Sequence, residues 1–291
     1  MNTPLFRTSF FLLTGIALLS SSSLLSLGLA GEGAGTSKST PQLPDALVDD
    51  DHARSELGVN EFTAPSIKKI FENLRDLPPI PQDQLKRARP EKLPMDRGEL
   101  SLELGFLMAD GFILVQAGQM GEVRPLAQEL ARYAKALGAG ERVNRHAASL
   151  LKHAEDGNID SLKDELALTQ KDVESELIAL RDPDLAHFIG LGGWIRALGV
   201  ATAALTAEFT PDKAVILFQP DIPEYFDEAL AGLDPLMLKR KDVAAIRRHL
   251  TTLQKQMTLP EGKKPTKEQL ATLTKTTQEL SKLALTRINT K

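Results

Sequence analysis

Residues 184–209, DLAHFIGLGGWIRALGVATAALTAEF, are the stretch that decides the fold. Between residues 185 and 205, every side chain is apolar or small except those of His187, Arg196 and Thr202. The run is long enough to cross a bilayer, but a central arginine costs about 2.5–3.5 kcal/mol on insertion. Its glycines weaken it as an isolated helix and let neighbouring helices approach closely. The stretch is therefore predicted to be the central helix of a bundle.

The sequence around this stretch is also typical of helices. Ala, Leu, Glu, Lys and Gln dominate, and β-branched residues never alternate as they do in strands. Helices are predicted at about 96–118, which is apolar on nearly every side, and at about 122–137, 141–155 and 158–182. Their lengths differ too much for a regular repeat. The expected fold class is all-α, as an irregular multi-helix bundle or a helical-hairpin stack.

Two further helices are predicted at the C-terminal end, in residues 236–291. Their apolar positions recur at spacings of three and four, as at the seam of a coiled-coil pair. The joining loop, 258–265, is so short that the helices must run antiparallel. We therefore expect a C-terminal antiparallel coiled-coil-like hairpin. Its predicted seam residues are Val243, Ile246, Leu250, Leu253 and Met257 in the first helix and Leu270, Leu273, Thr277, Leu280 and Ala284 in the second.

The first 30 residues have the pattern of a secretory signal peptide. A short region with one cation, Arg7, precedes an apolar run, and the small residues Gly28 and Ala30 suit a signal peptidase. We expect cleavage near Ala30 and export to the periplasm or the extracellular space; an uncleaved membrane anchor is the alternative. The chain contains no cysteine, which excludes disulfides and thiol catalysis.

Two segments with different sequence patterns lie between the signal peptide and the central helices. Residues 31–62 lack hydrophobic periodicity and contain glycine, proline and acidic runs, so they are predicted to be a disordered tether. Residues 63–95 are predicted to begin with a short helix, opened near Thr63-Ala64-Pro65-Ser66 by a capping residue and an early proline. They are predicted to continue as a proline-rich, mostly extended strap. The helical core is assigned to residues 96–235 and the basic hairpin to 236–291.

Charge divides the expected mature chain unevenly. Residues 236–291 contain 13 lysines and arginines against four acidic residues, a net charge of +9, whereas residues 31–235 contain 21 against 35, a net charge of −14. One interpretation is that the basic hairpin docks on the acidic body of the same chain. The functional interpretation is that it contacts an anionic envelope surface. The residues assigned to that contact are Lys239, Arg240, Lys241, Arg247, Arg248, Lys255, Lys263 and Lys264.

Four residues stand out as candidates for a ligand site between the central helices. Asp110, His187 and Arg196 are polar groups in apolar surroundings, and a buried ion is costly unless it is paired. We expect Asp110 to pair with Arg196, with His187 nearby or at the helix end. Such a pair either fixes the helix packing or marks a ligand pocket. Trp194, the only tryptophan, is expected in the core or at the lining of that pocket.

Motifs for catalysis, phosphate binding and metal binding are missing from the sequence. No GxSxG, P-loop, GxGxxG or HExxH pattern occurs, and His146 and His153 lie two helical turns apart. We therefore expect a non-enzymatic protein without a cofactor or metal, acting as an exported interaction or scaffolding protein. Its partner would be a protein or an anionic envelope component, with no nucleic acid and at most peripheral membrane contact. The alternative function is binding of a small ligand near Asp110, His187 and Arg196.

Overall fold

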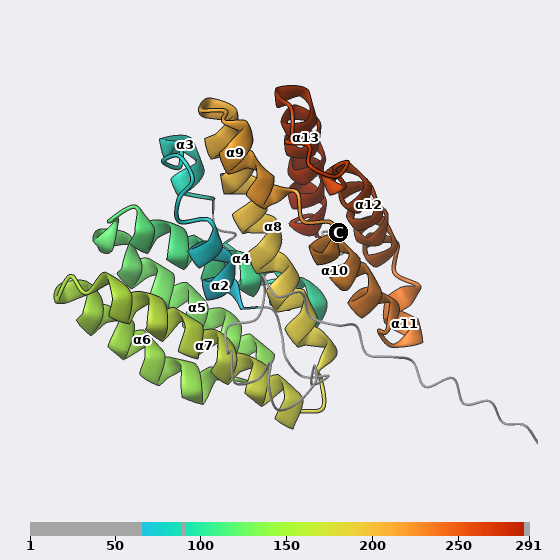
Figure 1. The fold of residues 1–291 in the computed structure, drawn as a ribbon. Helices are drawn as coiled ribbons and strands as arrows, with labels where there is room; N and C mark the ends of the chain where they lie inside the picture. The colour runs from blue at the N-terminus through green and yellow to red at the C-terminus, as the bar shows by residue number, and fades with distance from the viewer. Residues whose placement is uncertain (1–65, 89–90, 288–291) are drawn as a thin grey trace, which may run out of the picture. The chain divides into compact units, whose positions relative to one another are not determined.

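A computed structural model describes residues 66–88 and 91–287, and these fold as an all-α, multi-helix structure without a strand (Figure 1). All of them belong to one compact unit. The expected signal peptide and tether lie outside the described residues. The helices are α2 (Ile67–Asn73), α3 (Gln82–Leu85), α4 (Arg97–Gln116), α5 (Val123–Leu137), α6 (Gly140–Glu155), α7 (Ile159–Ala179), α8 (Asp184–Ala207), α9 (Pro211–Ala214), α10 (Asp221–Ala231), α11 (Pro235–Leu238), α12 (Lys241–Met257) and α13 (Lys267–Ala284).

Helices α4 and α8 form the centre of the fold and pack against each other more extensively than any other pair. Every residue of α4 from Gly98 to Val115 is buried. By length and composition α8 is apolar enough to cross a membrane, but 89% of its most apolar window is buried inside the protein. Because neither helix has a polar face, both need a shell of other helices. The prediction that residues 184–209 form a central helix is confirmed.

Glycines bring the backbones of α4 and α8 into direct contact. A Cβ atom added to Gly105 would lie 2.0 Å from the carbonyl oxygen of Ile189, and one added to Gly192 would lie 2.0 Å from that of Leu102. Real Cβ atoms essentially never come within 3.0 Å of another heavy atom. Any larger residue at these positions must therefore push the two helices apart.

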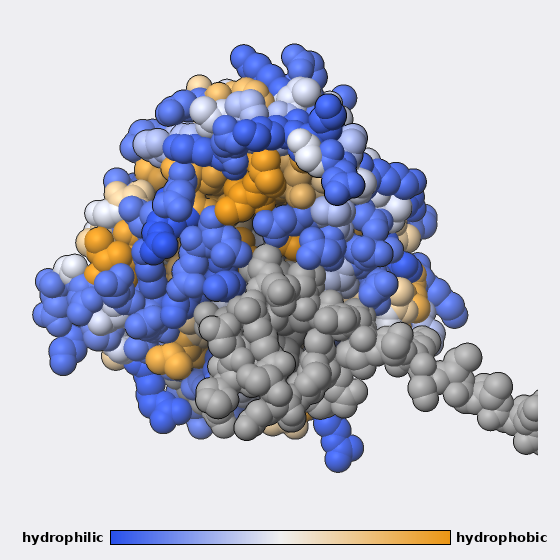
Figure 2. Space-filling view, viewed as in Figure 1, coloured by the Kyte–Doolittle hydropathy of each residue, from blue (hydrophilic) through white to orange (hydrophobic). Residues whose placement is uncertain are grey.

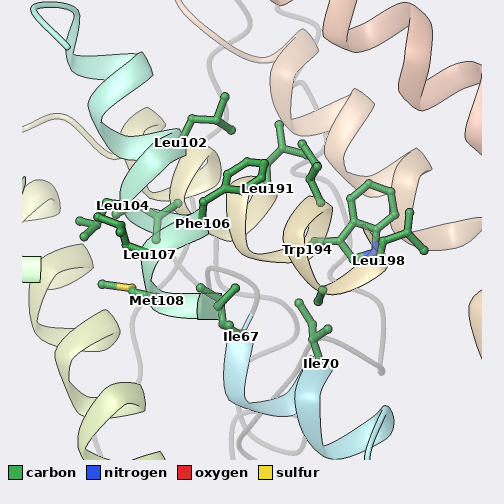
Figure 3. Close-up of a cluster of buried hydrophobic side chains, with 14 of the residues drawn as sticks. Ile67, Ile70, Leu102, Leu104, Phe106, Leu107, Met108, Leu191, Trp194 and Leu198 are labelled. Atoms are coloured by element: carbon green, nitrogen blue, oxygen red, sulfur yellow. The ribbon is translucent and has the colours of Figure 1, made fainter. Parts of the chain in front are cut away.

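Apolar side chains from three helices surround this contact (Figure 3). Figure 3 shows Ile67 and Ile70 of α2 close to the side chains that α4 and α8 contribute. Ile67 is fully buried, and its backbone N–H donates to Oε1 of Gln170 on α7 at 3.1 Å. The short helix α2 is therefore part of the core. Its N-cap is Ser66, with the side chain accepting from the Lys69 N–H, so Pro65 precedes the helix instead of lying in its first turn as expected.

Helices α5, α6 and α7 pack in succession on one side of α4. Gly138, with φ of 95°, ends α5 in the left-handed conformation that glycine adopts without strain. The side chain of Asn158 accepts from the N–H of Ser161 and begins α7. These boundaries follow the sequence prediction closely, because each depends on a local capping residue.

The structure differs from the sequence analysis at two single-turn helices. Helix α3 lies within the strap that was predicted to be mostly extended, and it buries Leu85. Helix α11 begins directly after Asp234, whose side chain caps it by accepting from the Leu236 N–H. No helix was expected at residues 235–238, although aspartate followed by proline is a pattern that begins a helix.

Helices α12 and α13 pack against each other and against the central part of the fold. Helix α13 contacts α8, and α12 contacts α10. The apolar positions predicted for the two helices are all buried. Thr277 is fully buried too, and its hydroxyl donates to the carbonyl of Leu273 at 2.8 Å. The basic segment thus shares a core with α8 and α10.

Replacing Gly192 with alanine tests the close crossing of α4 and α8. We expect G192A to lower the free energy of unfolding by about 3 kcal/mol, because overpacking displaces backbone rather than a flexible side chain. Gly199 lies on the same helix, and its added Cβ would meet nothing nearer than Oγ of Ser281 at 4.0 Å. We expect G199A to raise stability by about 0.5–1 kcal/mol through helix propensity. Denaturant unfolding of both variants measures the difference, and equal effects would contradict the account.

Candidate functional site

Asp110 on α4 and Arg196 on α8 form the ion pair that the sequence predicted. Nε of Arg196 donates to Oδ1 of Asp110 at 2.6 Å. The side chains are 6% and 10% exposed, so both charges are largely withdrawn from water. The pair joins the same two helices that the glycines bring together.

The pair is part of a larger charged cluster, which we call the arginine cluster. Nε of Arg87 donates to the second carboxylate oxygen of Asp110 at 3.2 Å, and Nη1 of Arg87 lies 3.5 Å from Glu103. Arg287, after α13, donates to the other oxygen of Glu103. Arg196 also donates to the backbone carbonyl of Gln84 at 2.7 Å. The cluster therefore links the strap, α4, α8 and the C-terminal end of the described chain.

The geometry of the arginine cluster favours a structural role. Glu103 and Asp110 are seven residues apart on α4, so they share a face and receive the arginines from one side. The guanidinium of Arg87 also lies over the ring of Phe106, 5.4 Å from its centroid. Burial and the nearby charge of Glu103 raise the pKa of Tyr133 on α5 well above its ordinary value. At neutral pH its phenol stays uncharged beside the carboxylate.

His187 and Trp194 lie on the other side of α8 from Arg196. His187 precedes Arg196 by nine residues, about two and a half helical turns, so the two side chains leave opposite faces. The hydroxyl of Tyr225, on α10, lies 3.4 Å from Nδ1 of His187. Burial lowers the pKa of His187, and the charge of Asp184 offsets this in part. His187 is thus at the helix end, the second of the two positions expected for it.

The four predicted ligand-site residues therefore do not form one pocket. Trp194 packs against Phe226 of α10 with ring centroids 5.5 Å apart, and it borders an apolar cavity of about 40 Å³. Asp110, His187 and Arg196 do not line that cavity, nor a second cavity of about 260 Å³ described below. The signal for a pocket was apolar surroundings alone, and these did not distinguish one face of α8 from the other.

The predicted basic surface divides into paired and unpaired cations. Three of the eight residues form ion pairs with acidic residues of the helical core. Nη1 of Arg240 lies 2.7 Å from Asp96, Nε of Arg247 lies 2.7 Å from Asp227, and Lys264 pairs with Asp212. Within the described residues, no ion pair is formed by the other five, Lys239, Lys241, Arg248, Lys255 and Lys263, all of which are exposed.

His146 forms a contact that the sequence analysis missed. On α6, its Nδ1 lies 2.5 Å from Glu165 and its Nε2 lies 3.0 Å from Asp172, both on α7. Because the two ring nitrogens point away from each other, the three groups do not converge on one point. Across the described part of the chain, no group of three or more His, Cys, Asp or Glu residues is placed to hold a metal ion. The contact instead fastens α6 to α7.

Comparison with known protein families, curated proteins and solved structures found no match for this chain. Function must therefore be argued from its own residues.

Removing the charge of Asp110 tests the arginine cluster. We expect D110N to lower the free energy of unfolding by about 3–5 kcal/mol, because it leaves Arg87 and Arg196 without their shared counter-charge. R196M should cost less, about 1–3 kcal/mol, because Asp110 keeps Arg87 as a partner. Denaturant unfolding distinguishes the two.

The control is the exposed pair of Arg97 and Asp182, whose side chains are 43% and 46% exposed. We expect D182N to cost less than about 1 kcal/mol. If R196M were as damaging as D110N, Arg87 would not be sharing the charge of Asp110.

Proposed function

We propose that this chain is an exported, non-enzymatic interaction or scaffolding protein that contacts an anionic surface of the cell envelope. Its N-terminal 30 residues direct export to the periplasm or the extracellular space, with cleavage near Ala30. The contact surface is a line of cations on α12.

The observation that carries this proposal is the spacing of three exposed cations. Lys241, Arg248 and Lys255 are seven residues apart on α12 and share one face, with ~10 Å between neighbours. We call them the basic stripe. None of the three forms an ion pair with another described residue. The helix contains one acidic residue, Asp242, and it is engaged by Arg240 at 2.8 Å.

The paired cations support a narrower contact surface than the sequence analysis assumed. Arg240, Arg247 and Lys264 hold α12 and the following loop to the acidic body, so part of the charge asymmetry is satisfied within the fold. Their pairing fixes the position of α12 and leaves the basic stripe facing outward. In this proposal Arg240 and Arg247 serve internal docking, while the neighbouring cations Lys241 and Arg248 serve outside contact.

An exposed line of cations suits an anionic surface physically. Each Lys or Arg near such a surface contributes about 1 kcal/mol, and salt weakens the attraction. In Figure 2, hydrophilic side chains predominate over α12 and α13, whereas apolar atoms show over α11.

We propose that α12 and α13 form an antiparallel coiled-coil-like hairpin. The capping box at Thr266 and Gln269, which begins α13, helps to keep it rigid.

Charge reversal of the basic stripe tests the proposal. We expect residues 31–291 to co-sediment with phosphatidylglycerol vesicles and with purified anionic cell-wall polymer at low salt. Binding should weaken at least tenfold in 0.5 M NaCl, because the attraction is screened. The triple variant K241E/R248E/K255E should lose this binding.

The matched control reverses three exposed lysines on α5, α6 and α7, in the variant K135E/K152E/K171E. It changes net charge equally and should retain most of the binding. Equal loss in both variants would show a dependence on net charge alone. If the unmodified protein bound neither vesicles nor polymer, the proposal would be wrong.

A further inference from the structure

A cavity of about 260 Å³ lies among α2, the C-terminal end of α4 and the first turns of α7. It is the larger of the two cavities described above. None of the residues that line it belongs to the arginine cluster or to the basic stripe. Its chemistry is therefore independent of the function proposed above.

Two stacked phenylalanines form its apolar wall. The rings of Phe71 on α2 and Phe112 on α4 lie with centroids 5.5 Å apart and planes 10° from parallel. Both side chains are held by the core, at 5% and 1% exposure, and both line the cavity. The wall is therefore rigid, and only small parts of the two rings are open to a ligand.

Charged groups of both signs surround this wall. Lys68 is already engaged by Asp164 at 3.0 Å. Arg75, Lys163 and Asp160 also line the cavity, and no ion pair joins any of them to another described residue. Two cations and one carboxylate thus remain available around an apolar wall.

We propose that this cavity binds a free α-amino acid with a large apolar or aromatic side chain. Arg75 and Lys163 receive the carboxylate, Asp160 receives the ammonium group, and the side chain lies against the parts of Phe71 and Phe112 that remain exposed. The volume corresponds to roughly nine water molecules, which is room for one such molecule. The acidic side of the rim disfavours ligands that carry only negative charge.

Calorimetric titration of residues 31–291 with four probes tests each part of the site. L-Phenylalanine carries both charges and the ring, and we expect a Kd of roughly 0.1–1 mM. Phenylalanine amide lacks the carboxylate, 3-phenylpropionate lacks the ammonium group, and glycine lacks the side chain. Each of the three should bind at least tenfold more weakly than L-phenylalanine.

Variants of the charged residues at the rim of the cavity test which of them binds the carboxylate and which binds the ammonium group of the ligand. We expect R75Q/K163Q to weaken L-phenylalanine and 3-phenylpropionate at least tenfold and not to weaken the amide, which is a cation. D160N should weaken L-phenylalanine and the amide, and it should not weaken 3-phenylpropionate, because it removes a negative charge that repels this anion. These rim positions are exposed or half-buried, so folding should be preserved, and thermal melting checks it. The control K171Q removes an exposed cation from the same helix, away from the cavity.

Two outcomes would overturn the proposal. One is that L-phenylalanine produces no binding heat at millimolar concentration with the folded protein. The other is binding that R75Q/K163Q, D160N and K171Q leave equally unchanged. Neither result bears on vesicle or polymer binding by the basic stripe, because none of these residues lies on α12.

Discussion

Backbone contact between α4 and α8 is the constraint on which the rest of the structure depends. Gly105 and Gly192 each leave room for a carbonyl oxygen of the opposite helix, so the two helices approach more closely than side chains of ordinary size allow. Because both helices are mostly buried, the helices that pack directly on them are positioned by the surface that this pair presents. Helix α2 fills one groove of that surface, α5 and α7 cover α4, and α13 covers α8.

The buried charges belong to the same interface and explain how the strap and the segment after α13 are held. Two carboxylates on α4, those of Glu103 and Asp110, receive three arginines from three different segments. Such a cluster adds little net stability compared with apolar packing, but breaking it is costly, so it favours one arrangement over its alternatives. The strap and the segment after α13 are thereby fixed to the central pair. The two surfaces to which we assign functions, the basic stripe and the rim of the larger cavity, lie outside this cluster.

Local signals in the sequence predicted most of the helices. Helix boundaries are identified by capping residues such as Asn158 and Gly138. The buried faces of α12 and α13 are identified by the periodicity of their apolar residues, and neither signal needs tertiary information. The pair of Asp110 and Arg196 was also predictable, because each is a charge isolated in an apolar run. The part that Arg87 and Arg287 play in the arginine cluster was not predictable. Both stand in polar sequence, where a buried arginine cannot be distinguished from a solvated one. The separation of His187 from Arg196 follows from their spacing of nine residues on one helix. The contact of His146 with α7, by contrast, depends on how α6 and α7 are rotated about their axes. A single sequence does not specify that rotation.

Native-state hydrogen exchange measures the central claim most directly. If the α4–α8 contact holds the fold together, amides in the middle of both helices should exchange only through global unfolding. Those of α12 and α13 should exchange through smaller openings, because these helices reach the core through α8 and α10. The contradicting result would be greater protection in α12 and α13 than in α4 and α8. The C-terminal helices would then be an independent folding unit, and the close crossing of α4 and α8 would not be the foundation of the structure.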